Sequence, residues 1–117
     1  MEQPRHCAYN KTRESFLALD VTVGEFTFAM LEQFLPEFAP KAGAGLWLLP
    51  FRGIPDRGLR APLDLVYLDA NCCVLDVVES FPAFCVSASS PPAASVLVLP
   101  AHSIFSSHTR SGDQLLI

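Results

Sequence analysis

The residues with the clearest chemical potential gather in one stretch of the sequence, where Arg52, Arg57 and Arg60 lie close to Asp56 and Asp64. Guanidinium groups bind phosphate and carboxylate through paired hydrogen bonds, so these residues could form a small-anion or nucleotide pocket, or an undiscovered enzymatic site. The alternative is structural, because a buried Asp64 needs partners, and either Arg60 or backbone amides would satisfy it. We favour the structural interpretation and keep Arg52, Arg57, Arg60 and Asp64 as the candidate ligand-binding residues.

The histidines and cysteines follow no catalytic or metal-binding pattern. His102 and His108 have a spacing that fits no usual pair of metal ligands on a helix, so we interpret them as surface or capping residues. Cys72 and Cys73 are adjacent, and no histidine or acid is marked as a catalytic partner for either thiol. The cysteines match no disulfide framework, which favours free thiols in a reducing compartment. We therefore expect no catalytic residue, no metal and no cofactor.

The composition predicts a chain that folds as one domain. Of its 117 residues, 50% are apolar and 17% are charged, which is the reverse of a disordered composition. Its net charge of -4 makes a nucleic-acid partner unfavourable, since such binding depends on neutralising phosphates. The apolar run from Ser95 to Phe105 is too short to cross a membrane, and residues 1–10 lack the apolar run of a signal peptide. We therefore expect a cytoplasmic protein without a membrane partner.

Hydrophobic periodicity and turn residues then mark the regular elements in the first two thirds of the chain. The pattern predicts strands over residues 16–21 and 46–49. Between them, apolar residues at helical spacing predict a helix over 27–35, which Thr27 can cap and Pro36 stops. Residues 63–79 predict a β-hairpin that turns at 69–71.

The last third of the chain carries further short elements. Residues 84–86 read as a short strand, and the continuous apolar run 95–99 predicts a strand that is covered on both faces. Residues 101–107 can form one or two helical turns, and a turn at 111–113 leads to a last strand over 114–117.

Together these elements predict an α+β, mostly β fold: a compact single domain of six to eight short strands with one α-helix packed on the sheet. We place the domain at residues 16–117 and treat residues 1–15 as an N-terminal segment. The predicted core contains Phe16, Leu17, Leu19, Leu31, Phe34, Leu46, Leu48, Leu65, Val66, Leu68, Val74, Leu75, Val96, Val98 and Leu115.

Several of these segments resemble one family pattern. A glycine-led apolar strand at 45–50, an Arg-x-Pro-x-Asp hairpin at 60–69, a Leu-Pro strand end at 97–100 and the Gly-Asp turn at 112–113 follow in the same order as in domain of unknown function 192. The resemblance implies a compact bacterial or archaeal β-rich domain with a helix, and it assigns no activity.

The chain also departs from that pattern. Many members carry Pro-Cys and then His-Thr after the first strand, where this chain has Pro50-Phe51 and Pro55-Asp56, so any thiol or imidazole chemistry of that loop is missing. Many members are exported, whereas residues 1–10 of this chain lack the apolar run of a signal peptide. The turn after the Leu-Pro strand end usually holds a glycine, whereas this chain has His102.

The sequence ends within the apolar run 114–117, so we expect either that the strand is paired within the fold or that the sequence continues in a larger protein. An unpaired end would expose an edge that can bind a partner. Our leading functional hypothesis is therefore a non-enzymatic binding, regulatory or scaffolding module of a bacterial cytoplasmic protein, with a homodimer or a protein partner at a sheet edge. The alternative is small-anion or nucleotide binding, or an undiscovered enzymatic site, at the arginine-rich loop 52–64.

Overall fold

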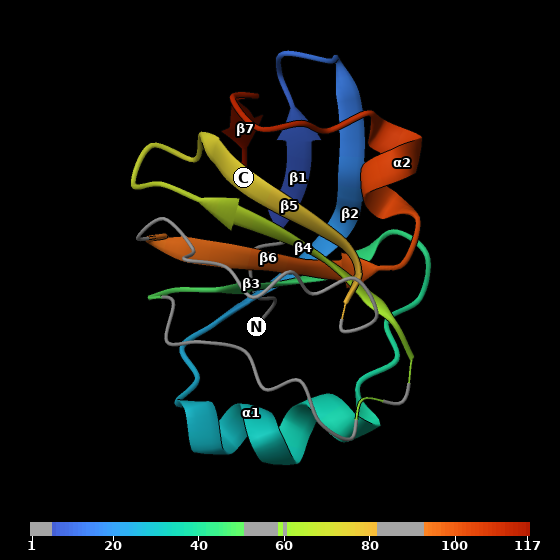
Figure 1. Cartoon of the computed structure of the whole chain (residues 1–117), viewed down its shortest axis with the longest axis vertical. Helices are drawn as coiled ribbons and strands as arrows, with labels where there is room; N and C mark the ends of the chain where they lie inside the picture. Colours follow the sequence, from blue (N-terminus) through green and yellow to red (C-terminus); the bar gives the residue numbers. More distant parts are fainter. Residues whose placement is uncertain (1–5, 51–58, 60, 82–92) are drawn as a thin grey trace, which may run out of the picture.

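A seven-stranded, curled sheet forms the frame of the protein in the computed structural model, which describes residues 6–50, 59, 61–81 and 93–117 (Figure 1). The strands lie in the order β5-β4-β6-β3-β2-β1-β7. They span His6–Asn10 (β1), Ser15–Gly24 (β2), Ala44–Leu48 (β3), Leu63–Leu68 (β4), Val74–Phe81 (β5), Ser95–Pro100 (β6) and Leu115–Leu116 (β7).

Two short α-helices accompany the sheet, α1 at Phe28–Phe34 and α2 at Ser103–Ser107, and a 3-10 turn over Leu35–Glu37 extends α1. The helix α1 crosses between the parallel strands β2 and β3, as a parallel connection requires. Thr27 caps α1 as expected, since its hydroxyl accepts a hydrogen bond from the amide of Met30. The predicted single helix is thus joined by a second, which forms where helical turns at 101–107 were expected.

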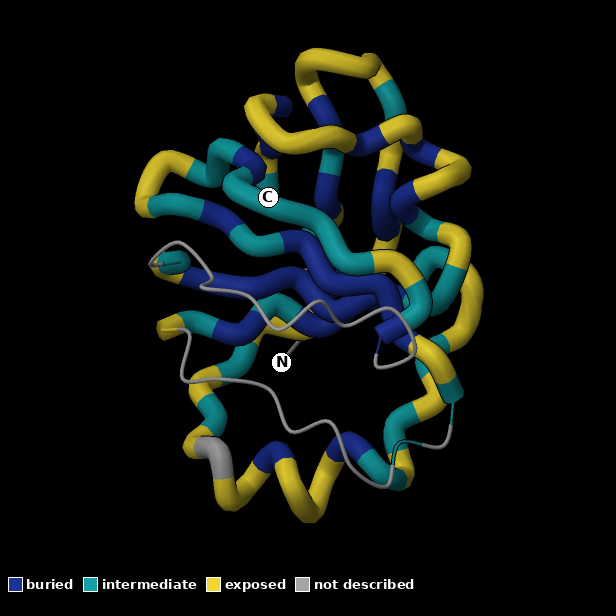
Figure 2. The backbone as a smooth tube through the Cα atoms, in the orientation of Figure 1, coloured by how far each residue is buried: buried dark blue, intermediate teal, exposed yellow. Residues whose placement is uncertain are grey.

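The expected hairpin is β4 and β5. The side-chain oxygen Oδ1 of Asp69 holds its turn by accepting the amides of Asn71 at 2.8 Å and Cys73 at 2.9 Å. Next to the hairpin, β6 pairs with both β4 and β3. Its five residues 95–99 are all buried, so the prediction of a strand covered on both faces is confirmed (Figure 2).

The alternation of side chains along β6 divides the core into two clusters. Leu97 and Leu99 pack in one cluster, with Ile104 of α2, whereas Val96 and Val98 pack in the other, with Leu31 of α1. Each helix therefore covers its own side of the central strand, because successive side chains of a strand point to opposite faces.

The C-terminal strand is paired within the fold. β7 pairs with β1, and the amide of Leu115 donates to the carbonyl of Cys72 at 3.0 Å. The amide of Val74 likewise donates to the carbonyl of Asp113 at 2.8 Å, so the chain around β7 also contacts the start of β5. These bonds join the two ends of the sheet order and curl the sheet, and Leu115 is buried as predicted. The same pairing places β1 in the sheet, inside the segment 1–15 that we set apart from the domain.

Three predicted core residues are exposed instead. Phe16 is 54% exposed, Leu19 is 64% exposed and Phe34 is 38% exposed, while Leu75 is only half-buried. The pairing of β1 with β2 shifts register around Ala8, so the side chains of β2 do not alternate regularly between core and solvent.

On α1, Phe34 stacks with Phe26 and Phe38 instead of packing under the sheet, and Leu31 and Leu35 form the buried stripe. The short strand predicted at 84–86 lies outside the described residues. Within the described part of the chain, no helix is long and apolar enough to span a membrane.

Two leucines on β2 test this arrangement. Leu17→Ala should lower the free energy of unfolding by about 2–5 kcal/mol, because Leu17 packs in the core and leaves a cavity when truncated. Leu19→Ala, two residues away, should change it by less than about 0.5 kcal/mol, because Leu19 is exposed. Urea unfolding followed by circular dichroism measures both free energies. An equal decrease in the two variants would contradict the burial of Leu17 and the exposure of Leu19 on β2.

Candidate functional site

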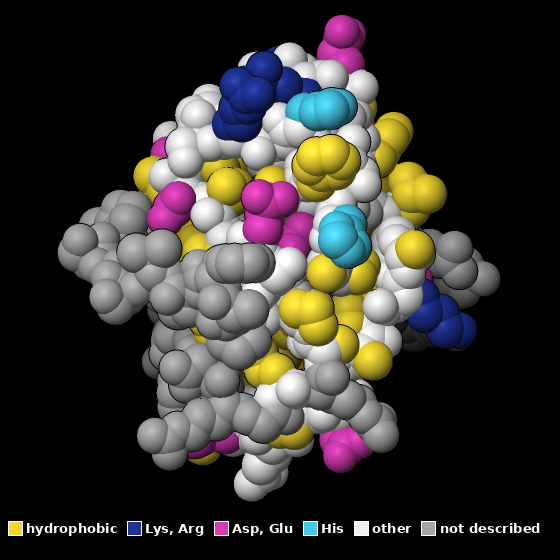
Figure 3. Space-filling model, turned by 45° about the vertical axis from the view of Figure 1, so that its right-hand side comes forward, with side chains coloured by type: hydrophobic (Ala, Val, Ile, Leu, Met, Phe, Trp, Pro, Cys, Tyr) yellow, Lys and Arg dark blue, Asp and Glu magenta, His cyan; other side chains and the backbone are white. Residues whose placement is uncertain are grey.

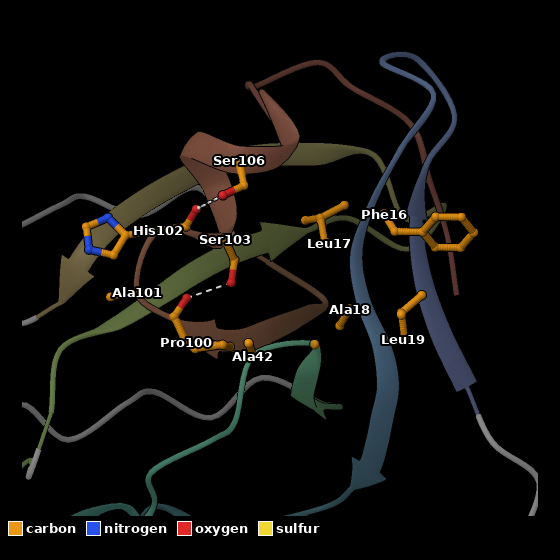
Figure 4. Close-up of a pocket in the computed structure, with 11 residues that line it drawn as sticks. Phe16, Leu17, Ala18, Leu19, Ala42, Pro100, Ala101, His102, Ser103 and Ser106 are labelled. Carbon is orange, nitrogen blue, oxygen red and sulfur yellow. Dashed lines mark hydrogen bonds between the residues drawn. The ribbon is translucent and has the colours of Figure 1, made fainter.

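An apolar pocket of about 540 Å³ lies where β2, the end of β6 and α2 meet (Figure 4). One wall comes from β2 and another from residues 100–106, and the turn before β3 contributes the rest. The residues that line the pocket are Phe16, Leu17, Ala18, Leu19, Ala42, Gly43, Pro100, Ala101, His102, Ser103 and Ser106.

The pocket exists because β2 is longer than its neighbour β3. The two strands pair from Asp20 to Gly24 of β2, so the first half of β2 extends past the start of β3. There the helix α2 lies beside β2, and the hydroxyl of Ser15 donates to the carbonyl of Ser107 at 2.7 Å. Small side chains at Ala18 and Ala42 then leave space between the walls.

Gly43 shapes the floor of the pocket. Its φ of 86° lies in the left-handed region that glycine adopts without strain. This turn directs its carbonyl to the amides of Leu19 at 2.8 Å and Asp20 at 3.0 Å. The floor is thereby tied to β2 by backbone hydrogen bonds.

A buried carboxylate holds α2 in place behind the pocket. Asp64 has no exposed surface, and its Oδ2 accepts the amide of Ile104 in α2 at 2.9 Å. Its Oδ1 accepts the amide of Ser80 in β5 at 3.0 Å. Asp64 therefore links β4, β5 and α2 through two backbone amides, as the structural interpretation of this residue expected.

The other predicted ligand-binding residues, Arg52, Arg57 and Arg60, lie outside the described residues, so the arginine-rich pocket stays a prediction. The pocket at β2 and α2 was missed by sequence reasoning. It is formed by residues from three distant segments, and the only local signal was the pair of small residues Ala42 and Gly43 next to a strand.

The hydroxyl groups of the pocket are bound to the backbone. Ser103 Oγ donates to the carbonyl of Pro100 at 2.7 Å, and Ser106 Oγ donates to the carbonyl of His102 at 2.8 Å. A serine nucleophile would instead need its proton directed to a base. The imidazole of His102 points away from both serines (Figure 4). This arrangement favours binding over covalent chemistry.

His102 itself adopts an unusual backbone conformation. Its φ of 76° places it in the left-handed region, immediately before α2. Glycine adopts that conformation most easily, so a residue with a side chain is uncommon at such a position. Among the described residues, no group of three or more histidine, cysteine, aspartate or glutamate side chains could hold a metal ion.

The surface around the pocket is unusually apolar. Phe105 on α2 is 72% exposed, and Phe16 and Leu19 on β2 are also largely exposed. Figure 3 shows hydrophobic side chains next to histidine side chains on this side of the molecule. Exposed apolar side chains gathered around a pocket are typical of binding sites.

A second polar cluster surrounds the buried carboxylate of Asp113, which is satisfied internally. Asp113 Oδ2 accepts hydrogen bonds from Asn10 Nδ2 at 2.9 Å, the amide of Arg110 at 3.0 Å and Arg13 Nε at 3.1 Å. Burial by itself raises the pKa of Asp113, but these three hydrogen bonds and the charge of Arg13 outweigh it and lower the pKa below its ordinary value of 3.8. This cluster ties β1 to the turn before β7 and offers no site.

Cys72 is not an activated thiol. Burial raises the pKa of the Cys72 thiol, and the nearby Asp69 and Cys73 raise it further, so the reactive thiolate is disfavoured. The Sγ of Cys73 donates to Gln114 Oε1 at 2.9 Å. Both thiols are half-buried parts of the turn that meets β7.

The fold is shared with known structures. Neither a protein-family model nor a curated protein matches the chain. A proposed transcription regulator from Sinorhizobium meliloti 1021 is 19% identical with a TM-score of 0.72, over 99% of this chain and 97% of that one. A protein of unknown function from Novosphingobium aromaticivorans DSM 12444 is 14% identical with a TM-score of 0.73, over 95% and 83%. These likenesses establish the fold and support no specific function, and the resemblance to domain of unknown function 192 stays a prediction.

The role of Asp64 can be tested by removing its acceptors. Asp64→Ala should lower the free energy of unfolding by at least about 2 kcal/mol, because two buried amides lose their partners. The amides of Ser80 and Ile104 should also exchange with solvent faster in hydrogen-exchange NMR. Asp20→Asn, at an exposed position on β2, is the control and should leave both measurements unchanged. Unchanged exchange at Ile104 in Asp64→Ala would contradict the role of this carboxylate in holding α2.

The lowered pKa of Asp113 predicts a pH dependence of stability. As the pH falls below about 5, the unfolded chain takes up this proton before the folded chain does, so the free energy of unfolding decreases until the pH is below the folded-state pKa. Urea unfolding between pH 3 and pH 7 should show this decrease, and Asp113→Asn should make it shallower. Leu19→Ala should keep the parent's pH profile. An equally steep decrease in Asp113→Asn would contradict this assignment.

Proposed function

We propose that the protein is a non-enzymatic binding domain that holds a small, mostly apolar organic molecule in the pocket between β2 and α2. The observation that carries this proposal is the pocket itself, whose volume of about 540 Å³ lies within the range of small-molecule sites, roughly 300–1,000 Å³. Its walls combine apolar side chains with a few polar atoms from one segment, which is the usual composition of such sites.

Binding is a better interpretation than catalysis because the pocket lacks an activated group. Both of its serine hydroxyls donate to backbone carbonyls, and His102, the one titratable residue in its lining, directs its ring away from them. A catalytic site would bring a nucleophile or an acid and a base within hydrogen-bond distance of each other. We therefore infer that a ligand is held here without being changed.

Other roles stay as predictions with less support. Both carboxylate oxygens of Asp64 accept backbone amides, so a small-anion or nucleotide site in the loop 52–64 would have to rely on the arginines. A homodimer or protein partner at a sheet edge would have to use β5, because β7 is paired, and β5 carries Asp76 and Glu79, the kind of charge that discourages edge pairing. A cytoplasmic location and membership of domain of unknown function 192 are likewise part of this proposal.

Ligand binding can be tested with 2-phenylethanol, a small aromatic probe that fits the pocket. Titration followed by ¹H–¹⁵N NMR should shift the amides of Ala18, Ala42 and Ser106, and saturating probe should raise the melting temperature, because ligand at 100 times its Kd adds about 2.7 kcal/mol to stability. Ala42→Trp should abolish both effects by filling the pocket, and the exposed position of Ala42 should let the variant fold.

The matched control is Ala70→Trp, which adds the same side chain at an exposed turn away from the pocket and should bind the probe like the parent chain. Shifts confined to other surfaces, or equal shifts in Ala42→Trp, would count decisively against the pocket as the binding site.

A further inference from the structure

We infer that the pocket between β2 and α2 selects ligands that carry a hydrogen-bond donor, an alcohol or an ammonium group on an apolar body, and rejects carboxylates and phosphates. This inference rests on the proposed function and names the class of ligand that the same pocket takes. Three features of the walls support it: the directions of the serine protons, the partners of the backbone amides, and the distribution of charge.

The serine hydroxyls face a ligand as acceptors. The proton of Ser103 Oγ is directed to the carbonyl of Pro100, and the proton of Ser106 Oγ is directed to the carbonyl of His102. A hydroxyl that donates its proton keeps two lone pairs on its oxygen. Ser103 and Ser106 can therefore accept a hydrogen bond from a bound molecule without giving up the bonds that shape the turn at 100–103.

Four backbone amides next to the pocket already donate hydrogen bonds within the protein. The amides of Leu19 and Asp20 donate to the carbonyl of Gly43, and the amide of Ser106 donates to the carbonyl of His102. The amide of Ile104 donates to the buried carboxylate of Asp64. An anion is normally held by several backbone or side-chain donors that converge on it, and here these donors already have partners.

The charged residues near the pocket also disfavour an anionic ligand. The described residues that line the pocket include neither lysine nor arginine. Behind the wall lies the carboxylate of Asp64, 2.9 Å from the amide of Ile104, which directly follows the lining residue Ser103. A fully buried carboxylate is poorly screened by water, so its charge opposes an anion in the pocket and favours a cation. A carboxylate or phosphate would thus lose its hydration without gaining a counter-charge from a lysine or arginine of the lining.

The rest of the ligand must be apolar. Leu17, Ala18, Pro100 and Ala101 are apolar residues of the lining on the side that carries the two serines. Burying an aliphatic or aromatic group against these side chains provides the main binding free energy, while the serine oxygens orient the polar end. A small aromatic or branched aliphatic alcohol or primary amine satisfies both requirements.

A matched set of probes tests the selectivity. Ethylbenzene, 2-phenylethanol, 2-phenylethylamine and phenylacetate share one hydrocarbon skeleton and differ at the polar end. In NMR titrations of the parent chain at pH 7, the alcohol and the ammonium compound should bind about 3- to 10-fold more tightly than ethylbenzene, which corresponds to one net hydrogen bond. Phenylacetate should bind more weakly than ethylbenzene.

Variants of the serines connect the selectivity to the proposed acceptors. Ser106→Ala should remove most of the advantage of 2-phenylethanol over ethylbenzene while leaving ethylbenzene affinity unchanged, and Ser106→Thr, which retains the hydroxyl, should restore it. Ser106 is exposed on α2, so these variants should fold, and melting curves without probe check this. If Ser106→Ala keeps the full advantage, Ser103→Ala must remove it, and retention in both variants would overturn the role of the serines.

The outcomes separate this inference from the proposal on which it rests. If none of the four probes shifts the pocket amides, the proposed function fails. If the probes bind in the pocket and are blocked by Ala42→Trp, but phenylacetate binds as tightly as 2-phenylethanol, the pocket stands as a binding site and the donor selectivity is wrong.

Discussion

The structure depends on one buried carboxylate. Asp64 sits in a fully buried stretch of β4, residues 63–66, where an ionisable group is tolerated only if its oxygens are satisfied. It accepts one amide from β5 and one from α2, and so joins segments that are far apart in the chain. A helix of only five residues is unstable on its own, so α2 depends on this link together with the packing of Ile104 in the core and the hydrogen bond from Ser15 to Ser107. The pocket therefore depends on how Asp64 is satisfied as well as on the length of β2.

The long strand β2 plays two parts in this arrangement. Its second half pairs with β3 and belongs to the parallel unit that carries α1, whereas its first half pairs with β1 and contacts α2. The pocket lies on the first half of β2, which extends past the start of β3 and lies beside α2. Exposed apolar residues such as Phe16 and Leu19 are stable there because the rest of β2 is held firmly on both sides.

The polar contacts at the far end of the sheet complete the frame. Asn10 and Asp113 join β1 to the turn before β7, and backbone bonds to residues 72–74 join that turn to the hairpin. β7 then pairs with β1 on one side, while an isolated bridge between Cys73 and Gln114 ties the residue before it to the hairpin, so the C-terminal strand is not a fully open edge.

Local patterns in the sequence by themselves determined much of this fold. The cap and the proline around α1, the hairpin turn at Asp69, and the apolar run of β6 are each encoded within a few consecutive residues, since they rest on backbone preferences and on short-range hydrogen bonds. The sequence also predicted that a buried Asp64 would need partners, from the cost of burying a charge.

Only the tertiary structure decided which partners Asp64 has, which side chains of β2 face solvent, and that a pocket forms. Ser80 and Ile104 lie 16 and 40 residues from Asp64, and β1 pairs with β2 through a register shift, beside which Leu19 is exposed although Leu17, two residues earlier, is buried. The pocket is lined by β2, by the turn before β3 and by residues 100–106, which are distant from one another in the sequence. Contacts of this kind depend on how distant parts of the chain pack together, and no local pattern of residue types specifies that packing.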